Sequence, residues 1–297
     1  HKVTILDDLS TGSLNNIENF RNNRLCEFVE GSVLDQSVLA ELATDANIIF
    51  HLAAAVGVEL VVKDPVYTIE TNVHGTENVF ACAEKTNTRV VMASTSEVYG
   101  RADRPLFCET DDLIIGPPTL YRWSYAASKA LDEYLALAYY KEQRLQPVIV
   151  RMFNTVGPRQ TGEYGMVVPR FIEQALAEKP ITVYGDGNQS RCFCHVRDCV
   201  RALRNLADSD EAYGGIFNVG SNESVTINEL AYLIKRITGS SSEIVHIPYD
   251  EAYDPGFEDM YHRAPDTAKI KALTGWQPEF KLKEIIEDSI RYLKDES

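Results

Sequence analysis

Long apolar runs are missing from this sequence, and so is any excess of positive charge. No stretch approaches the roughly 20 apolar residues that a membrane-spanning helix needs. The chain has 44 acidic and 29 basic residues, a net charge of −15, and such a surface repels nucleic acid and anionic membranes. We therefore expect neither as a partner. An anionic ligand would bind only where arginines or lysines gather locally.

Paired cysteines and metal-ligand spacings are also missing. The six cysteines include no C-x-x-C pair and no histidine-rich spacing. Only Cys192 and Cys194 stand close together, and a single strand with alternating faces explains that spacing better than a metal or redox site does. We expect no metal site, and we expect the reduced thiols of a cytoplasmic protein.

Strand-like and helix-like runs alternate over the first 153 residues. Two stretches with helical spacing, 64–85 and 123–143, stand out among five β-rich runs, at 2–6, 26–29, 46–52, 89–92 and 147–150. This rhythm predicts an α/β fold with a doubly wound parallel sheet, covered by helices on both faces. From residue 154 glycine and proline become frequent and short elements mix. We expect 154–297 to form a smaller α/β domain interleaved with the first, 1–153.

A glycine-rich loop is missing in front of the first strand. That strand ends at Asp7, and in a doubly wound Rossmann domain such an acidic residue follows the glycine loop by about 20 residues. We therefore expect roughly 25 further residues in front of His1, including a first strand and the loop. A fold that never had them is the alternative.

Tyr125 and Lys129 form the first chemically informative pair. They are four residues apart in a helix-like stretch, so their side chains share one face. An ammonium near a phenol favours the phenolate and lowers its pKa. Tyr125 could then remove a proton from an alcohol while a hydride leaves for a cofactor. The spacing alone is weak evidence, because an exposed helix face also produces it.

Hydroxyl residues follow the strand expected at 89–92. Thr95 would lie at the carboxyl edge of the sheet, where such folds bind ligands, and could share a proton with Tyr125 and an alcohol. A polar turn after a strand is the plainer explanation. The correct order of Thr95, Tyr125 and Lys129 along the chain favours the functional interpretation.

Three runs together resemble the NAD-dependent nucleotide-sugar epimerase/dehydratase family of extended short-chain dehydrogenases/reductases. They are Ser94-Thr-Ser-Glu-Val-Tyr-Gly100, Tyr125-x-x-x-Lys129 and Arg151-x-Phe-Asn-x-x-Gly-Pro-Arg159. The resemblance implies a catalytic trio of Thr95, Tyr125 and Lys129, a 4-keto sugar intermediate, and an NAD that each cycle restores. It implies NAD binding by 1–153, nucleotide-sugar binding by 154–297, and a homodimer formed through the helices at 64–85 and 123–143.

The resemblance also assigns binding residues. For NAD they are Asp7, Asp35, Leu52, Ala53, Ala54 and Asn72, together with Tyr125 and Lys129. For the nucleotide sugar they are Ser96, Asn154, Arg159, Arg170, Tyr184, Arg191 and Arg263. Arginine suits the pyrophosphate because its planar fork can bind two phosphate oxygens at once.

Glu97 bears on the reaction that follows C4 oxidation. A carboxylate beside C5 or C6 could remove the C5 proton or steer the loss of a neighbouring carboxylate. The run Thr95-Ser-Glu97, with 113–117 and Arg122-Trp-Ser-Tyr125, resembles the decarboxylase branch. We favour an epimerase or decarboxylase of a UDP-sugar. A 4,6-dehydratase of the GDP-mannose or dTDP-glucose type is the alternative, and an inactive fragment or non-catalytic partner subunit is another, since the pyrophosphate lacks its glycine cradle.

Overall fold

A four-stranded parallel sheet forms the centre of the molecule. The computed structural model describes residues 1–162, 166–252, 258 and 260–295. The strands lie in the order β10-β5-β4-β3, and all three pairings are parallel. Their bounds are Ile48–His51 for β3, Arg89–Thr95 for β4, Pro147–Met152 for β5 and Ile216–Val219 for β10. Parallel strands need crossover connections, and long helices supply them here.

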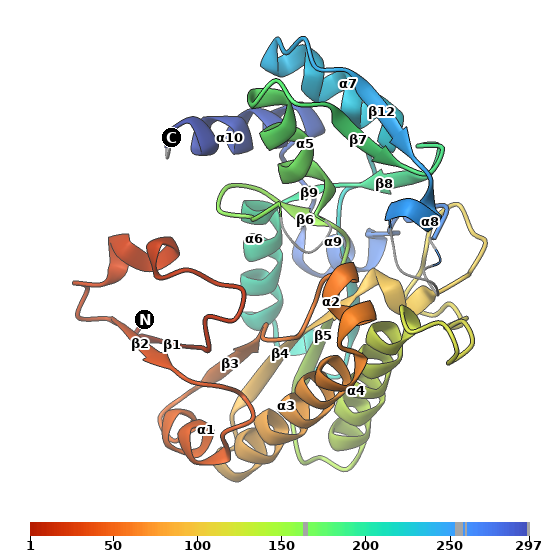
Figure 1. Cartoon of the computed structure of the whole chain (residues 1–297). Helices are drawn as coiled ribbons and strands as arrows, with labels where there is room; N and C mark the ends of the chain where they lie inside the picture. Colours follow the sequence, from red (N-terminus) through yellow and green to blue (C-terminus); the bar gives the residue numbers. More distant parts are fainter. Residues whose placement is uncertain (163–165, 253–257, 259, 296–297) are drawn as a thin grey trace.

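Helices cover both faces of this sheet, as Figure 1 shows. On one face α3 (Pro65–Thr86) packs beside α4 (Trp123–Lys141), and on the other lies α6 (Val196–Ala207). Neighbouring residues of β4 point to opposite faces. Met92 packs in the cluster that contains Phe80 of α3, and Val91 packs with Leu203 of α6. The doubly wound α/β fold predicted from the sequence is confirmed.

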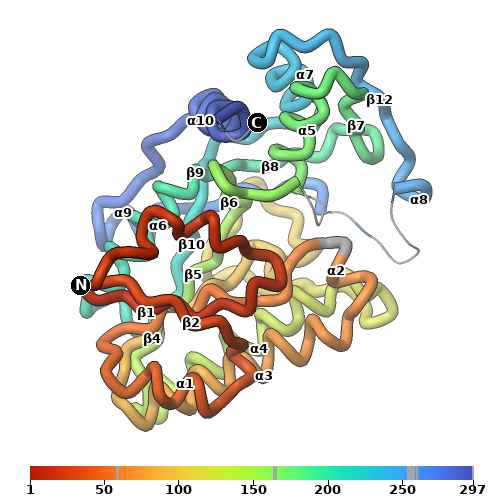
Figure 2. Tube along the Cα trace, turned by 60° about the vertical axis from the view of Figure 1, so that its left-hand side comes forward, coloured from red at the N-terminus to blue at the C-terminus, as the bar shows by residue number. Residues whose placement is uncertain are grey.

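The N-terminal strands form a separate small sheet. β1 (Val3–Asp7) pairs in parallel with β2 (Cys26–Glu30), and the two make a two-stranded sheet of their own among the described residues. A 3-10 helix, η1 (Leu14–Phe20), joins them, and α1 (Gln36–Ala43) follows β2. Figure 2 shows this N-terminal segment in red, beside α1.

A second apolar core lies in the later part of the chain. Here α5 (Val167–Leu176), α7 (Ile227–Thr238) and α10 (Leu282–Asp295) pack around β7 (Ile181–Tyr184), which pairs with β12 (Ile244–Ile247). β10 also comes from this part of the chain, yet it pairs with β5 in the first sheet. The domain boundary after residue 153 stays a prediction.

The remaining described elements are short. They are α2 (Val58–Lys63), η2 (Ser96–Tyr99), β6 (Thr155–Val156), β8 (Ser190–Cys192), β9 (Cys194–His195), η4 (Asp210–Ala212), β11 (Ser224–Thr226), α8 (Tyr249–Ala252) and α9 (Ala268–Thr274). In the described part of the chain, no helix is both long and apolar enough to cross a membrane.

The strand expected through Cys192 and Cys194 is interrupted, which corrects the prediction from the sequence. β8 ends at Cys192 and pairs with β11, whereas β9 begins at Cys194 and pairs with β6. Both cysteines and the intervening Phe193 are buried, because the chain changes strand partners at Phe193. Alternation between a buried and an exposed face therefore does not explain this spacing.

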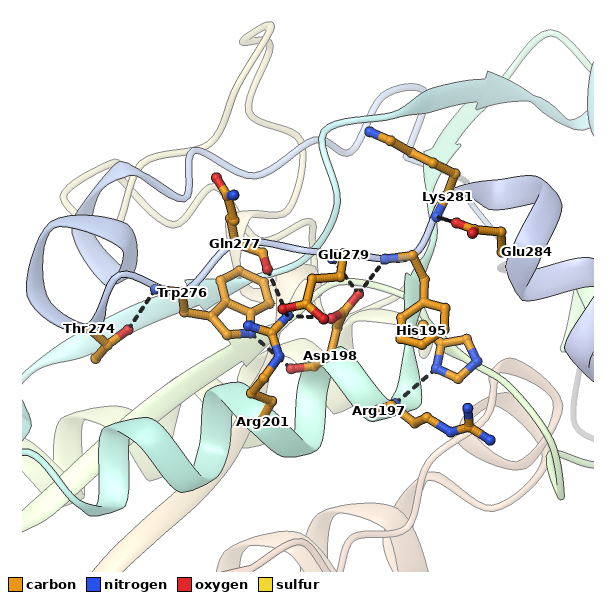
Figure 3. Close-up of polar contacts among 11 residues, drawn as sticks. His195, Arg197, Asp198, Arg201, Thr274, Trp276, Gln277, Glu279, Lys281 and Glu284 are labelled. Carbon is orange, nitrogen blue, oxygen red and sulfur yellow. Dashed lines mark hydrogen bonds and ion pairs between the residues drawn. The ribbon is translucent and has the colours of Figure 1, made fainter.

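Asp198, in the first turn of α6, binds the segment that leads into α10 (Figure 3). Its Oδ2 accepts the backbone N–H groups of Glu279 and Phe280 at 3.0 and 3.1 Å, and its Oδ1 accepts from Arg201. The indole of Trp276 donates to the Asp198 carbonyl at 3.0 Å. These bonds fix the chain that leads into α10 against the start of α6.

Candidate active site

The hydroxyls of Thr95 and Tyr125 meet at the carboxyl end of the sheet. Thr95 is the last residue of β4, and Tyr125 lies in the first turn of α4. A hydrogen bond joins the two side chains. Thr95 Oγ1 also accepts the backbone N–H of Glu97 at 3.2 Å, which fixes its orientation. The structure thus brings together the two hydroxyls that the sequence selects.

The electrostatics at Tyr125 differ from the expectation. Burial and then the Glu97 carboxylate raise the pKa of Tyr125, while the bond to Thr95 opposes the rise. Lys129 was expected to lower it, but the Lys129 ammonium donates to Asp132 Oδ2 at 2.9 Å. Asp132 itself adds to the rise in the pKa of Tyr125. The ammonium of Lys129 is thus paired with a buried carboxylate, which the spacing of Tyr125 and Lys129 could not reveal. The negative charge of Asp132 offsets the effect of the Lys129 charge on the pKa of Tyr125.

A cleft opens beside Tyr125 between the two cores. Most residues predicted for catalysis or substrate binding line it: Thr95, Ser96, Glu97, Tyr125, Asn154, Arg170, Tyr184, Arg191 and Arg263. Among the residues that the structure describes, the lining contains four arginines, Arg122 and the three named above, and one carboxylate, Glu97. In a protein of net charge −15, this local excess of positive charge suits an anionic ligand.

Arg122 and Arg263 both approach Glu97. Arg263 Nη1 lies 3.2 Å from Glu97 Oε1, and Arg122 Nη2 lies 3.6 Å from the same oxygen. Arg263 also donates to Asn154 Oδ1 at 3.2 Å, and its Nη1 lies 3.5 Å from Ser96 Oγ. Sequence reasoning gave Arg122 no role of its own. The available signal was its place three residues before Tyr125, at the start of α4.

The far end of the cleft contains an arginine stacked on an aromatic ring. The Arg170 guanidinium carbon lies 3.9 Å from the centre of the Tyr184 ring, and Arg170 also donates to Thr182 at 3.3 Å. Arg191 is buried and donates to the Ser190 carbonyl at 2.8 Å. Two cationic side chains and a ring therefore lie within reach of one elongated ligand.

The structure does not bring Arg159 into the cleft. It has a positive φ of 71°, and its Nη1 donates to the carbonyl of Asn16, in η1, at 2.6 Å. Sequence reasoning missed the apolar wall of the cleft, to which Val56, Val61 and Met166 contribute. Aliphatic residues of this kind carry no recognisable motif.

The residues predicted for the cofactor gather at the carboxyl ends of β1 and β3. Asp7 ends β1, with its Oδ1 accepting the Leu9 N–H at 2.8 Å, and Leu52 and Ala53 follow β3. Leu52 is 53% exposed. Carboxylate at one strand end and bare apolar surface at the next suit the ribose and ring faces of NAD. These residues therefore fit NAD, which when bound supplies the hydride acceptor for alcohol oxidation.

Asp35 and Asn72, both predicted to bind NAD, also form hydrogen bonds that stabilise the fold. Asp35 caps α1, accepting the N–H groups of Ser37 and Val38, and these bonds lower the pKa of its carboxyl. Asn72 is buried in α3, where its amide accepts the Ala55 N–H at 2.7 Å and donates to the Ala55 carbonyl. It also donates to Ser128 of α4. Asn72 thereby holds the segment after β3 in place. Ala54, just before Ala55, is half-buried.

The chain is similar to known proteins over almost its whole length. Residues 1–289 match the model of the GDP-mannose 4,6 dehydratase family. A UDP-N-acetyl-alpha-D-glucosaminuronate decarboxylase of Bacillus cytotoxicus is 40% identical over 297 residues, covering 99% of this chain and 91% of the relative. UDP-glucuronic acid decarboxylase 1 of Danio rerio is 35% identical, covering 100% and 68%.

Solved structures of the same fold contain NAD. A UDP-glucuronic acid 4-epimerase from Bacillus cereus, a mutant in complex with NAD and a fluorinated UDP-glucuronic acid, superposes with a TM-score of 0.88 at 25% identity. The matched region covers 100% of this chain and 92% of that one.

The parallel sheet and the Thr95–Tyr125 pair at its carboxyl edge define an extended short-chain dehydrogenase/reductase. NAD is the cofactor of this enzyme, as it is of similar proteins whose structures contain it. Among these enzymes, the chain belongs to the nucleotide-sugar epimerase/dehydratase family. The resemblance noted in the sequence is thereby confirmed.

Proposed function

We propose that this enzyme is a decarboxylase of a UDP-hexuronate. The observation that carries the proposal is the approach of Arg122 and Arg263 to Glu97, beside Tyr125. Both guanidinium groups line the cleft beside Tyr125. The carboxylate of a hexuronate would accept charge-assisted hydrogen bonds from them, and this would hold the sugar next to Tyr125.

The chemistry follows from oxidation at C4. Tyr125 would take the proton of the C4 hydroxyl, Thr95 would share that hydrogen bond, and NAD held by the first part of the chain would supply the hydride acceptor. The product is a β-keto acid, in which the bond between C5 and C6 can break. Carbon dioxide would leave, the bonding electron pair would move onto the C4 oxygen as an enolate, and C5 would then receive a proton. Arg122 and Arg263 would orient the carboxylate for this step, and Glu97 would hold the two guanidinium groups in place. Return of the hydride to C4, and of the proton from Tyr125 to the C4 oxygen, would restore both the cofactor and the base.

The similar proteins support this proposal over the alternatives. Two relatives that span nearly all of this chain carry the names of UDP-uronate decarboxylases. We therefore propose UDP-N-acetylglucosaminuronate as the substrate, with the pyrophosphate on Arg191 and the base near Arg170 and Tyr184. Decarboxylation makes the enzyme a lyase, whereas 4-epimerisation would make it an isomerase. Ser96 and Asn154, which contact Arg263, would shape the sugar site.

A panel of UDP-sugars tests the reaction directly. Mass analysis of the products should detect loss of carbon dioxide from UDP-N-acetylglucosaminuronate or UDP-glucuronate. Loss of water from a UDP-hexose would instead establish a dehydratase. A change of configuration without a change of mass would establish an epimerase. Glu97→Gln should still oxidise C4, so reduced nicotinamide accumulates, but it should release little carbon dioxide.

Two arginines around Trp123 provide a matched pair of variants. Arg122 and Arg101 lie at similar distances from the Trp123 ring, 5.7 and 5.9 Å, but only Arg122 lines the cleft. Arg122→Met should lower kcat/KM for the uronate by about a hundredfold, because it removes a charge-assisted bond to the substrate. Arg101→Met should leave it unchanged. Equal effects of the two variants would contradict a carboxylate site at Arg122.

We also propose that the enzyme is a homodimer formed through α3 and α4. Apolar residues spaced three apart are exposed on both helices, and Leu131 and Tyr134 of α4 are 52% and 68% exposed. Val66 and Ile69 of α3 are exposed as well. A second copy would cover this surface. Sedimentation should detect a dimer that Leu131→Glu dissociates; a monomeric parent protein would refute the proposal.

The remaining proposals concern domains and location. We propose that 1–153 holds NAD, through Asp7, Asp35, Leu52–Ala54 and Lys129, and that 154–297 holds most of the nucleotide sugar. All six cysteines are free thiols, which suits the reducing conditions of the cytoplasm. Co-fractionation of the enzyme with periplasmic or secreted marker proteins would argue against that location.

A further inference from the structure

A buried ion pair lies directly behind the proposed base. The side chains of Lys129 and Asp132 are 2% and 1% exposed, and Lys129 Nζ lies 2.9 Å from Asp132 Oδ2. They are one helical turn apart in α4, and Lys129 is one turn from Tyr125. Burial of two charges gives little net stability by itself, because their desolvation offsets their attraction. The pair therefore calls for a role other than stabilising the fold.

A hydrogen-bonded chain extends this pair across three elements. The hydroxyl of Thr76, in α3, bonds to the Asp132 carboxylate and lies 3.1 Å from His51 Nε2, at the end of β3. Thr76 is completely buried and His51 nearly so. Burial, and then the charge of Lys129, lower the pKa of His51 to about 3, so its ring is neutral at physiological pH. His51 therefore adds no second positive charge beside Asp132, whose Oδ2 accepts from Lys129 and whose Oδ1 is buried without a hydrogen-bond partner among the described residues.

Within the part of the chain that the structure describes, few other charges act on Asp132 and Tyr125. Glu133, the next residue of α4, raises the pKa of Asp132, but its own carboxylate is bound by Arg151 of β5 at 2.7 Å. On the cleft side, Glu97 raises the pKa of Tyr125 and Arg263 lowers it. Asp132 is therefore the one carboxylate among the described residues that contacts Lys129 directly and also acts on Tyr125.

We propose that Asp132 is a positioning residue for the reaction: it fixes the Lys129 ammonium one turn from Tyr125 and limits how strongly that charge acts on the phenol. The ammonium has three N–H donors, of which Asp132 takes one, so its direction is set before any substrate enters. The carboxylate is the counter-charge of an ammonium that would otherwise be unpaired in the protein interior. This inference rests on Tyr125 being the base of the proposed function, but not on the identity of the sugar.

Asp132→Asn separates this role from a structural one. The carboxylate contributes to raising the pKa of Tyr125, so its removal lets the phenol ionise at lower pH. The acidic limb of kcat/KM against pH should move to lower pH, while turnover at the optimum falls because Lys129 is no longer held. C4 oxidation is followed by the absorbance of reduced nicotinamide, which does not require decarboxylation. If the substrate panel shows no loss of carbon dioxide, this measurement still tests Asp132.

Controls distinguish charge from packing. Thr76→Val removes a hydroxyl from the same buried chain but no charge, so the acidic limb should keep its position. Asp132→Glu restores the carboxylate and should return the limb toward that of the parent protein. If Asp132→Asn does not fold, Asp132→Ser makes the same change of charge with less bulk. An unshifted acidic limb in a folded, charge-removed variant, with only a lower thermal midpoint, would overturn the proposal.

Discussion

Asp132 and Asp198 are both almost fully buried aspartates, and each pairs with a cation three residues away in its own helix. Asp198 is surrounded by donors: two backbone N–H groups and Arg201 satisfy its oxygens. Asp132 has Lys129 as its only cationic partner among the described residues, and burial raises the pKa of its carboxyl. A carboxylate whose oxygens are all hydrogen-bonded stabilises the fold. A buried carboxylate with a raised pKa beside a catalytic base can instead change the pKa of that base.

The largest expected effect comes from Tyr125→Phe, which removes the group on which Asp132 would act. Turnover should fall by about a hundred- to ten-thousand-fold, since a positioned base contributes that much to proton transfer. The fold should survive, because only the hydroxyl and its bond to Thr95 are lost. Steady-state kinetics and a thermal melt measure the two quantities. Unchanged turnover would remove Tyr125 from the mechanism and, with it, the functional contrast between the two aspartates.

Asp198→Asn should have the opposite signature. It weakens the bonds to Glu279, Phe280 and Arg201 while leaving the cleft untouched. We expect the free energy of unfolding to fall by about 2 kcal/mol, discounted because Arg201 is partly exposed. Urea unfolding gives this value, and kcat per folded molecule should stay at that of the parent protein. A large loss of kcat in the folded variant would make Asp198 more than a structural residue.

At neutral pH the smallest of these effects is expected at His51, because its titration changes stability only in acid. Its pKa is about 3 in the folded protein, against about 6.5 when unfolded. As the pH falls below about 6.5, the unfolded chain binds a proton that the folded protein refuses, so stability is lost until about pH 3. His51→Gln removes this titration and should make unfolding less sensitive to acid, by about 5 kcal/mol at most. Parallel pH dependences of unfolding in both proteins would show that His51 titrates alike in each state.

The order of strands and helices could be predicted because it depends on local pattern. The β-rich runs and the two stretches with helical spacing locate β1 to β5 and the long helices α3 and α4 to within a few residues. The Thr95–Tyr125 pair could be predicted for a similar reason, since strand ends of a parallel sheet share one edge. Both inferences need only a residue's neighbours in sequence.

Contacts between distant residues could not be predicted in this way. Arg122 gains its meaning from Glu97 and from Arg263, which lies far along the chain. Arg159 turns to Asn16 rather than to the cleft, and nothing near it in sequence indicates that contact. Asp132 stands close to Lys129 in sequence, but its effect on Tyr125 depends on burial, which the spacing alone does not report.

The pairing of β10 with β5 limits how this protein can be divided. In a fragment that ends after residue 153, β5 would become an exposed edge strand of the sheet. The apolar surface that includes Val91 and Val148 would also lose the cover of α6. Such a fragment should aggregate rather than bind cofactor. Chimeras that exchange sugar specificity between relatives would therefore have to graft loops around the cleft. A single crossover point after residue 153 would separate β10 from its partner strand β5.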